Sequence, residues 1–204
     1  PSAIRYAGLD DRIADLGRRC EDFGDVVTAV AEATSVVDER VRYLPQIKAT
    51  CERIAELVAG AVTDGYYPLV LGGDHSVALG TLGGLARASG AGGVLWFDAH
   101  GDLNRPETSP SGNVHGMPLA AALGLAGPEF ESEVYPLPAL EPARVALVGV
   151  RSLDPGEREL LAQFLRLGGF EVDTAGDGAD ALDYLRARGK PDVVLMDMSM
   201  PRCD

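Results

Sequence analysis

Residues 96–104 read Trp-Phe-Asp-Ala-His-Gly-Asp-Leu-Asn and directly follow the apolar residues 93–95. The apolar run is typical of a short buried strand, and the residues after it put Asp98, His100 and Asp102 at every second position. Because alternate side chains of an extended segment point the same way, these three are expected to converge at the end of the strand. Two carboxylates and an imidazole form a ligand set suited to Mn, Zn, Fe or Co rather than to a thiolate site.

Two further polar motifs are expected to lie near this one. The apolar run 68–71 is followed by Gly-Gly-Asp-His-Ser, which places His75 at the start of a predicted helix. The loop 111–116 reads Ser-Gly-Asn-Val-His-Gly and carries His115 before an Ala/Leu-rich segment. The three histidines of the chain therefore all follow predicted strands. In an open α/β sheet, ligands bind at the carboxyl ends of the strands, so one shared site is predicted.

These motifs carry a family resemblance. GGDHS, WFDAHGDLN and SGNVHGMPLA, in this order and spacing, resemble the ureohydrolases and, among them, most closely the arginases. The resemblance runs from Pro1 to about Glu159. It implies a three-layer α/β/α fold with a mostly parallel, doubly wound sheet. It also implies hydrolysis of L-arginine to ornithine and urea at a centre of two Mn²⁺ ions, and assembly as a trimer or hexamer.

The resemblance also implies roles for individual residues. The residues that match four metal ligands, with Asp98 bridging, are His75, Asp98, His100 and Asp102. His115 matches a proton-shuttling histidine and is assigned to catalysis together with Asp102. The loop that would hold the α-carboxylate of arginine contains Asn104, Ser111 and Asn113, and the acids near its α-amino group are Asp154 and Glu157. Two bound metals would lower the pKa of a shared water, and a protonated group would assist departure of the amine.

The segment Asp154-Pro155-Gly156-Glu157 has a second reading. Proline in the first turn and acids near the helix N-terminus are typical of a helix start, so these residues could serve only to begin the next helix.

The later part of the chain departs from the arginase pattern. That family takes two more metal ligands from an Asp-x-Asp motif, and no such motif occurs after residue 160. Residues 160–204 instead resemble the first half of a response-regulator receiver domain, with Asp197 matching the phosphoacceptor. We therefore expect an arginase-like portion over 1–159, a partial receiver-like segment over 160–204 that continues the same sheet, and a fold incomplete at both ends.

Three functions follow from this organisation. The first is Mn²⁺-dependent hydrolysis of L-arginine or a related guanidino compound, with Asp197 as a candidate substitute ligand. The second is a signalling module phosphorylated on Asp197. The third is a non-catalytic fragment or chimera that binds one metal or fewer.

Composition limits the other classes of function. The 204 residues provide enough chain for one α/β domain with a core. A net charge of −13 argues against nucleic acid or an anionic membrane as a partner. The three scattered cysteines (Cys20, Cys51 and Cys203) are typical of a reducing, cytoplasmic compartment. The sequence contains neither a signal-peptide pattern nor an apolar run of about 18 residues.

Hydrophobic periodicity predicts alternating helices and strands. The expected helices cover 3–17, part of 36–64, 76–88, 115–123, 155–167 and 178–188. The expected strands cover 22–27, 68–71, 93–97, 144–150, 170–174 and 192–196.

Overall fold

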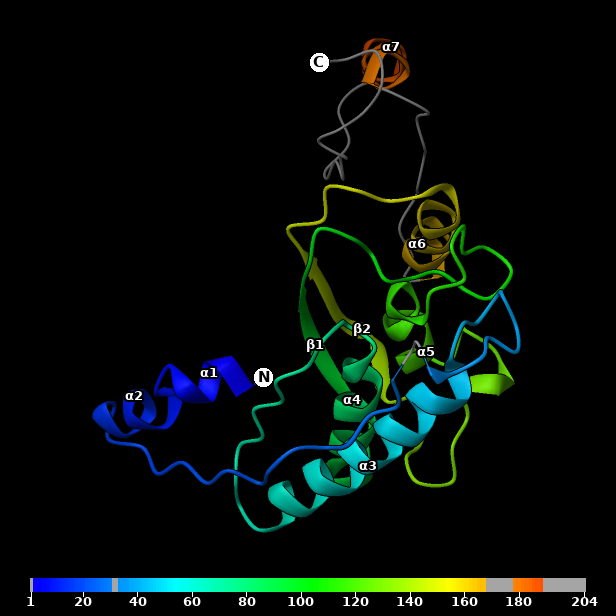
Figure 1. Cartoon of the computed structure of the whole chain (residues 1–204). Coiled ribbons are helices and arrows are strands. Elements are labelled where there is room, and N and C mark those ends of the chain that lie inside the picture. The colour runs from blue at the N-terminus through cyan, green and yellow to red at the C-terminus, as the bar shows by residue number, and fades with distance from the viewer. Residues whose placement is uncertain (1, 31–32, 168–177, 189–204) are drawn as a thin grey trace.

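The computed structural model describes residues 2–30, 33–167 and 178–188 (Figure 1). Its α-helices are α1 (Ser2–Tyr6), α2 (Leu9–Asp15), α3 (Leu44–Thr63), α4 (Val77–Ser89), α5 (Pro118–Ala122), α6 (Pro155–Leu167) and α7 (Gly178–Arg188). Two 3₁₀ turns, η2 (Val114–Gly116) and η3 (Pro128–Phe130), and two strands, β1 (Gly92–Phe97) and β2 (Leu140–Val148), complete the described elements. Among the described residues, no helix is long and apolar enough to cross a membrane.

The two strands pair in parallel, as expected for an α/β fold. Val94 pairs with Val145 and Phe97 with Val148, after a register shift that follows Gly92. Trp96 is buried on the face that turns toward the core, while Leu95 and Phe97 on the opposite face are 66% and 70% exposed. The alternation along β1 therefore aims its inward residues at the helices and brings Asp98 to the end of the strand.

Helices α3 and α4 pack side by side next to the sheet (Figure 1). The contact depends on two glycines of α4, because a Cβ at Gly80 would lie 2.5 Å from the carbonyl oxygen of Cys51 and one at Gly84 would lie 2.7 Å from that of Ala55. The largest fully buried side chains include Tyr135, Phe130 and Met117. A single buried cluster thus joins the helices to the sheet and supports the loops at its carboxyl end.

The N-terminal helices form an arm that stands apart from α3 and α4 (Figure 1). The predicted helix over 3–17 is divided at Gly8, whose φ of 76° lies in the left-handed region that suits glycine and ends α1. The predicted strand at 22–27 is wrong. Asp22 and Asp25 pair with Arg5 instead, and Phe23 makes an edge-on ring contact with Tyr66, so side chains rather than a backbone ladder hold the segment.

The predicted strand at 68–71 is also wrong, because this segment has no hydrogen-bonded strand partner among the described residues. The strand predicted at 144–150 begins earlier, at Leu140, and the helices predicted at 76–88, 155–167 and 178–188 are confirmed to within one residue. Helix α6 continues unbroken across the expected boundary at residue 159. The strands predicted at 170–174 and 192–196, and the residue Asp197, lie outside the described residues.

Candidate active site

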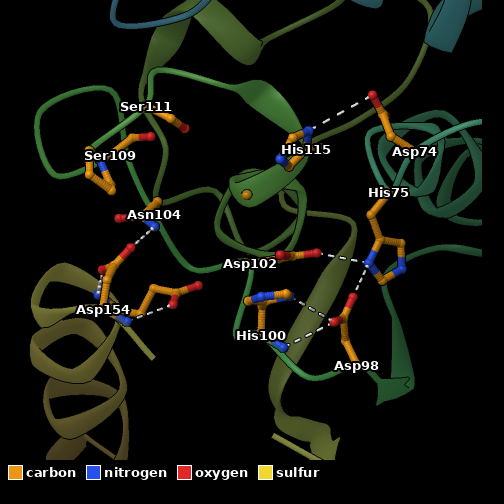
Figure 2. A pocket seen from close by; sticks show the side chains of 13 residues that line it. Asp74, His75, Asp98, His100, Asp102, Asn104, Ser109, Ser111, His115 and Asp154 are labelled. Carbon is orange, nitrogen blue, oxygen red and sulfur yellow. Dashed lines mark hydrogen bonds and ion pairs between the residues drawn. The ribbon is translucent and has the colours of Figure 1, made fainter. Parts of the chain in front are cut away.

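A cavity of about 370 Å³ opens at the carboxyl end of β1 (Figure 2). All three histidines of the sequence line it. Five acidic residues line it as well: Asp74, Asp98, Asp102, Asp154 and Glu157. The residues expected to share one site therefore line a single cavity, and the excess of carboxylates suits a cationic ligand.

Three side chains converge on the floor of this cavity. Nδ1 of His75 lies 2.7 Å from Oδ2 of Asp98 and 2.8 Å from Oδ2 of Asp102. One ring nitrogen carries at most one proton, so it cannot satisfy both carboxylates, and the buried Oδ2 of Asp102 has no geometrically acceptable hydrogen-bond partner among the described residues. One ligand atom from each of the three residues lies within 4.8 Å of the others, so they could hold a divalent metal ion.

The backbone around Asp102 positions its carboxylate. Asp102 has a φ of 50°, an uncommon conformation for a residue with a side chain. Its carbonyl oxygen accepts hydrogen bonds from the N–H groups of Leu119 and Ala120, in the first turn of α5, at 3.1 and 3.2 Å. These bonds hold the peptide in place and turn the side chain toward His75.

Trp96 packs against the same cluster through its contact with His75. Its ring stacks on the imidazole of His75 with centroids 4.2 Å apart and an angle of 26° between the planes. Because Trp96 is the only tryptophan of the chain, its fluorescence is expected to report the state of this site.

The other two histidines are more exposed. Nδ1 of His100 lies 3.2 Å from Oδ1 of Asp98, but the side chain is 62% exposed and its ring is not part of the compact cluster. His115 lies across the cavity, with its Nδ1 3.9 Å from Oδ2 of Asp74 (Figure 2). Sequence analysis missed Asp74, although its position directly before His75 could have indicated a role at the site.

The side of the cavity away from His75 is lined by neutral polar residues as well as by acids. Nδ2 of Asn104 donates a hydrogen bond of 2.6 Å to Oδ2 of Asp154 (Figure 2). Ser111 lines the cavity, whereas Asn113 is not among its lining residues and its backbone N–H bonds the hydroxyl of Ser111. The structure thus brings Asn104, Ser111 and Asp154 to the cavity, and it leaves Asn113 outside.

The charges of the cluster influence one another. The carboxylate of Asp102, more than that of Asp98, raises the pKa of His75 above its ordinary value. Burial acts to raise the pKa of Asp98, but the backbone N–H of His100 and the ring of His75 outweigh it, so that pKa is lowered. Burial also raises the pKa of Glu157, against the opposing hydrogen bond from the N–H of Asp154.

A pH titration should detect the raised pKa of His75. In the metal-free chain, we expect the fluorescence emission of Trp96 to increase as the pH is raised, because a protonated imidazole quenches a stacked indole. The midpoint of this transition should lie above pH 6.5. The stability that this charged group contributes is fully present below pH 6.5 and is lost as the pH rises through the folded-state pKa. Fluorescence titrations of wild-type and His75→Asn chains will test this. An identical transition in both chains would contradict the assignment.

Fold and site together define an α/β protein with a candidate divalent-metal site at the carboxyl ends of parallel strands. The sequence model of the Arginase family matches residues 1–191, so the chain belongs to the arginase family. The chain is 46% identical over 175 residues to the arginase of Bacillus caldovelox, with 85% of this chain and 57% of the relative covered. It is 45% identical over 196 residues to the arginase of Bacillus subtilis, with 92% of this chain and 64% of the relative covered.

Solved structures give the same result for the fold. The structure of native Bacillus caldovelox arginase at pH 5.6 matches with a TM-score of 0.75 and 43% identity, covering 93% of this chain and 60% of that one. The Bacillus cereus arginase structure matches with a TM-score of 0.73 and 42% identity, covering 85% and 56%. The chain is therefore similar in fold to arginases and spans less than two thirds of the length of these relatives.

The comparisons bear on the later part of the chain as well. The family match continues past the expected boundary at residue 159, to residue 191. This supports an arginase-family assignment for most of the segment that resembled a receiver domain, and the comparisons give no evidence for a receiver.

Proposed function

We propose that the cavity binds L-arginine or a related guanidino compound and hydrolyses its guanidinium group with the help of Mn²⁺. The observation that carries the proposal is the convergence of ligand atoms from His75, Asp98 and Asp102, together with a buried oxygen of Asp102 that accepts no hydrogen bond from the described part of the chain. These residues would hold the metal, with His100 joining through its contact with Asp98. Bound Mn²⁺ supplies Lewis acidity that makes water a better nucleophile near neutral pH.

The remaining residues of the cavity are assigned to the substrate. A cationic guanidinium is attracted by the acidic lining, and Asn104 and Ser111 offer an amide and a hydroxyl to the α-carboxylate of the amino acid. We infer that Asn113 contributes indirectly, through the bond between its N–H and the Ser111 hydroxyl. Asp154 is hydrogen-bonded to Asn104, and we assign it to accept a hydrogen bond from the α-amino group. The buried Glu157 lies in the same first turn of α6 and is assigned to the same region.

His115 is assigned to proton transfer. Its imidazole is about half exposed at the cavity wall, and Asp74 faces its Nδ1 at 3.9 Å. An imidazole can both accept and donate a proton, so His115 is proposed to carry a proton between the reacting amine and solvent.

A non-catalytic metal site is the second candidate. One observation supports this second candidate. The described residues provide one compact group of three ligands, whereas a centre of two Mn²⁺ ions in the arginase family takes six. Phosphorylation of Asp197 stays a prediction of the receiver resemblance, since that residue lies outside the described residues. A cytoplasmic location, assembly as a trimer or hexamer and the division at residue 159 likewise stay predictions.

Metal stoichiometry and urea release will distinguish the candidates. After incubation with excess Mn²⁺ and desalting, we expect bound manganese and release of urea from L-arginine that depends on it. Agmatine is the matched control, because it lacks the α-carboxylate assigned to Asn104 and Ser111 and should be a poorer substrate. One equivalent of Mn²⁺ without urea would support the non-catalytic candidate, and no retained Mn²⁺ would contradict both.

A further inference from the structure

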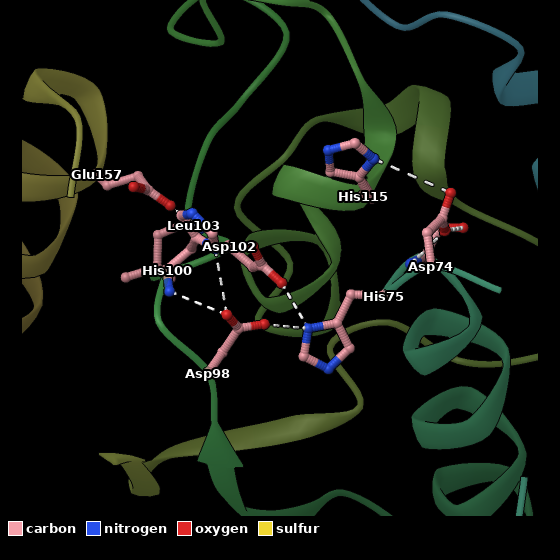
Figure 3. A network of polar contacts seen from close by, with 9 residues as sticks. Asp74, His75, Asp98, His100, Asp102, Leu103, His115 and Glu157 are labelled. Carbon is pink, nitrogen blue, oxygen red and sulfur yellow. Dashed lines mark hydrogen bonds and ion pairs between the residues drawn. The ribbon is translucent and has the colours of Figure 1, made fainter. Parts of the chain in front are cut away.

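The loop after β1 and the start of α6 are joined by two adjacent hydrogen bonds. The backbone N–H of Leu103 donates to Oε1 of Glu157 at 3.3 Å, and Nδ2 of Asn104 donates to Oδ2 of Asp154 at 2.6 Å. Figure 3 shows Glu157 extending from α6 to Leu103, beside Asp102 and Asp98. The helix start therefore contacts the loop at the two residues that directly follow Asp102.

Both acids also cap α6. The N–H of Glu157 donates to Oδ1 of Asp154 at 3.0 Å, and the N–H of Asp154 donates to Oε2 of Glu157 at 3.1 Å. This reciprocal pair is a capping box, so residues 154–157 do begin the helix, although capping is not their only contact. The capping box uses one oxygen of each carboxylate. The second oxygen of each reaches the loop after β1.

Two glycines allow the close approach. A Cβ at Gly101 would lie 2.7 Å from Cδ2 of Leu153 and 3.2 Å from Oε1 of Glu157. A Cβ at Gly156 would lie 2.6 Å from Cβ of Thr108. A side chain at Gly156 would crowd the Cβ of Thr108, which cannot move without its backbone, and would push α6 away from the loop. The atoms near Gly101 belong to the ends of side chains, which can move more easily.

We propose that Glu157 is a positioning residue that fixes the loop carrying Asp102. The carbonyl group of Asp102 is held from one side by the N–H groups of α5, and the peptide N–H of Leu103 is held from the other side by Glu157. The two sets of hydrogen bonds anchor a single peptide group, the one that links Asp102 to Leu103, at its oxygen and at its nitrogen. They thereby help to maintain the unusual backbone conformation at Asp102, whose φ is 50°, and with it the direction of the carboxylate. Glu157, at 4% exposure, thus acts on the site through the backbone. The link to metal binding rests on the proposed function.

Glu157→Gln separates the two roles of this carboxylate. A glutamine keeps one carbonyl oxygen for the capping box but replaces the other oxygen with an NH₂ donor, which cannot accept from Leu103. In the metal-free full chain, we expect hydrogen exchange at the Leu103 amide to accelerate about 10-fold, because that amide loses a bond to a charged acceptor. The Mn²⁺ dissociation constant, followed by Trp96 fluorescence, should rise about 10-fold, as for other groups that orient metal ligands.

Glu159→Gln is the matched control. It makes the same change of charge on the same helix, but Glu159 is exposed and its carboxylate accepts a hydrogen bond from Gln163 one turn further along α6. We expect this variant to leave Leu103 exchange and Mn²⁺ affinity unchanged. Gly156→Ala retains both acids while crowding Thr108, and it should reproduce the loss of Leu103 protection if Glu157→Gln proves unstable.

The exchange measurement keeps this inference separate from the proposed function. Normal protection of Leu103 in a folded Glu157→Gln chain would overturn the positioning role. Faster exchange spread equally over α6 would also overturn it, because Glu157 would then serve only as a helix cap. A wild-type chain that shows no fluorescence response to Mn²⁺ would count against the proposed function alone, since Leu103 exchange is measured without metal.

Discussion

Asp102→Asn is expected to weaken Mn²⁺ binding by at least about 100-fold, a larger effect than that of altering a residue which only orients a ligand. Asp102 is 4% exposed, and its Oδ2 lies 2.8 Å from Nδ1 of His75 in the cluster that also contains Asp98. The substitution removes the negative charge and keeps the shape of the side chain. Asparagine also tolerates a positive φ, so the backbone at 50° is not an obstacle to folding.

Titration of Trp96 fluorescence with Mn²⁺ measures this effect directly, because the indole stacks on His75. Glu107→Gln is the control, since it removes one exposed carboxylate from the same loop region and should change the affinity by less than about 3-fold. A folded Asp102→Asn chain with wild-type Mn²⁺ affinity would show that the metal binds elsewhere or not through this cluster.

Gly80→Ala is expected to destabilise the fold by about 3 kcal/mol, at the upper end of the usual cost of overpacking. The new methyl group would lie 2.5 Å from the carbonyl oxygen and 2.8 Å from the Cα of Cys51. Both are backbone atoms of α3, so no side chain can rotate away and the two helices must separate. For a chain of this size, the midpoint of thermal unfolding should fall by roughly 10 °C.

Gly60→Ala provides the matched comparison within α3. A Cβ at Gly60 meets nothing within 4 Å, so the substitution adds a helix-favouring residue without a clash. It should stabilise the chain by about 0.5–1 kcal/mol. Thermal or urea unfolding of the three chains gives both values, and equal stability of the two variants would contradict the account of the α3–α4 contact.

Local patterns were enough to locate the centre of the site. The alternation of Asp98, His100 and Asp102 after an apolar strand predicted a shared polar site, and His75 and His115 do line the same cavity. The periodicity of α3, α4 and α6 was also sufficient, because an amphipathic helix is specified by neighbours three and four residues apart.

Strands were predicted less well than helices for a related reason. Residues 68–71 are as apolar as a buried strand, but a strand exists only when another segment supplies the backbone hydrogen bonds. Among the described residues, β1 and β2 are the only strands that pair, and the paired residues lie about 50 positions apart in the sequence. The sequence of either segment alone does not show which other segment it will pair with.

The sequence by itself determined the kinds of ligand atoms at the site, the order of the motifs and the membership of the chain in the arginase family. Only the tertiary structure decided that His75 and Asp102 meet while His100 stays largely exposed, and that Asn113 is left outside the cavity. It also revealed that one carboxylate oxygen of Glu157 caps helix α6 while the other accepts a hydrogen bond from the N–H of Leu103. These outcomes depend on how residues about 30 to 50 positions apart are brought together by packing, and on backbone angles such as that of Asp102. Neither is encoded in the spacing of a motif.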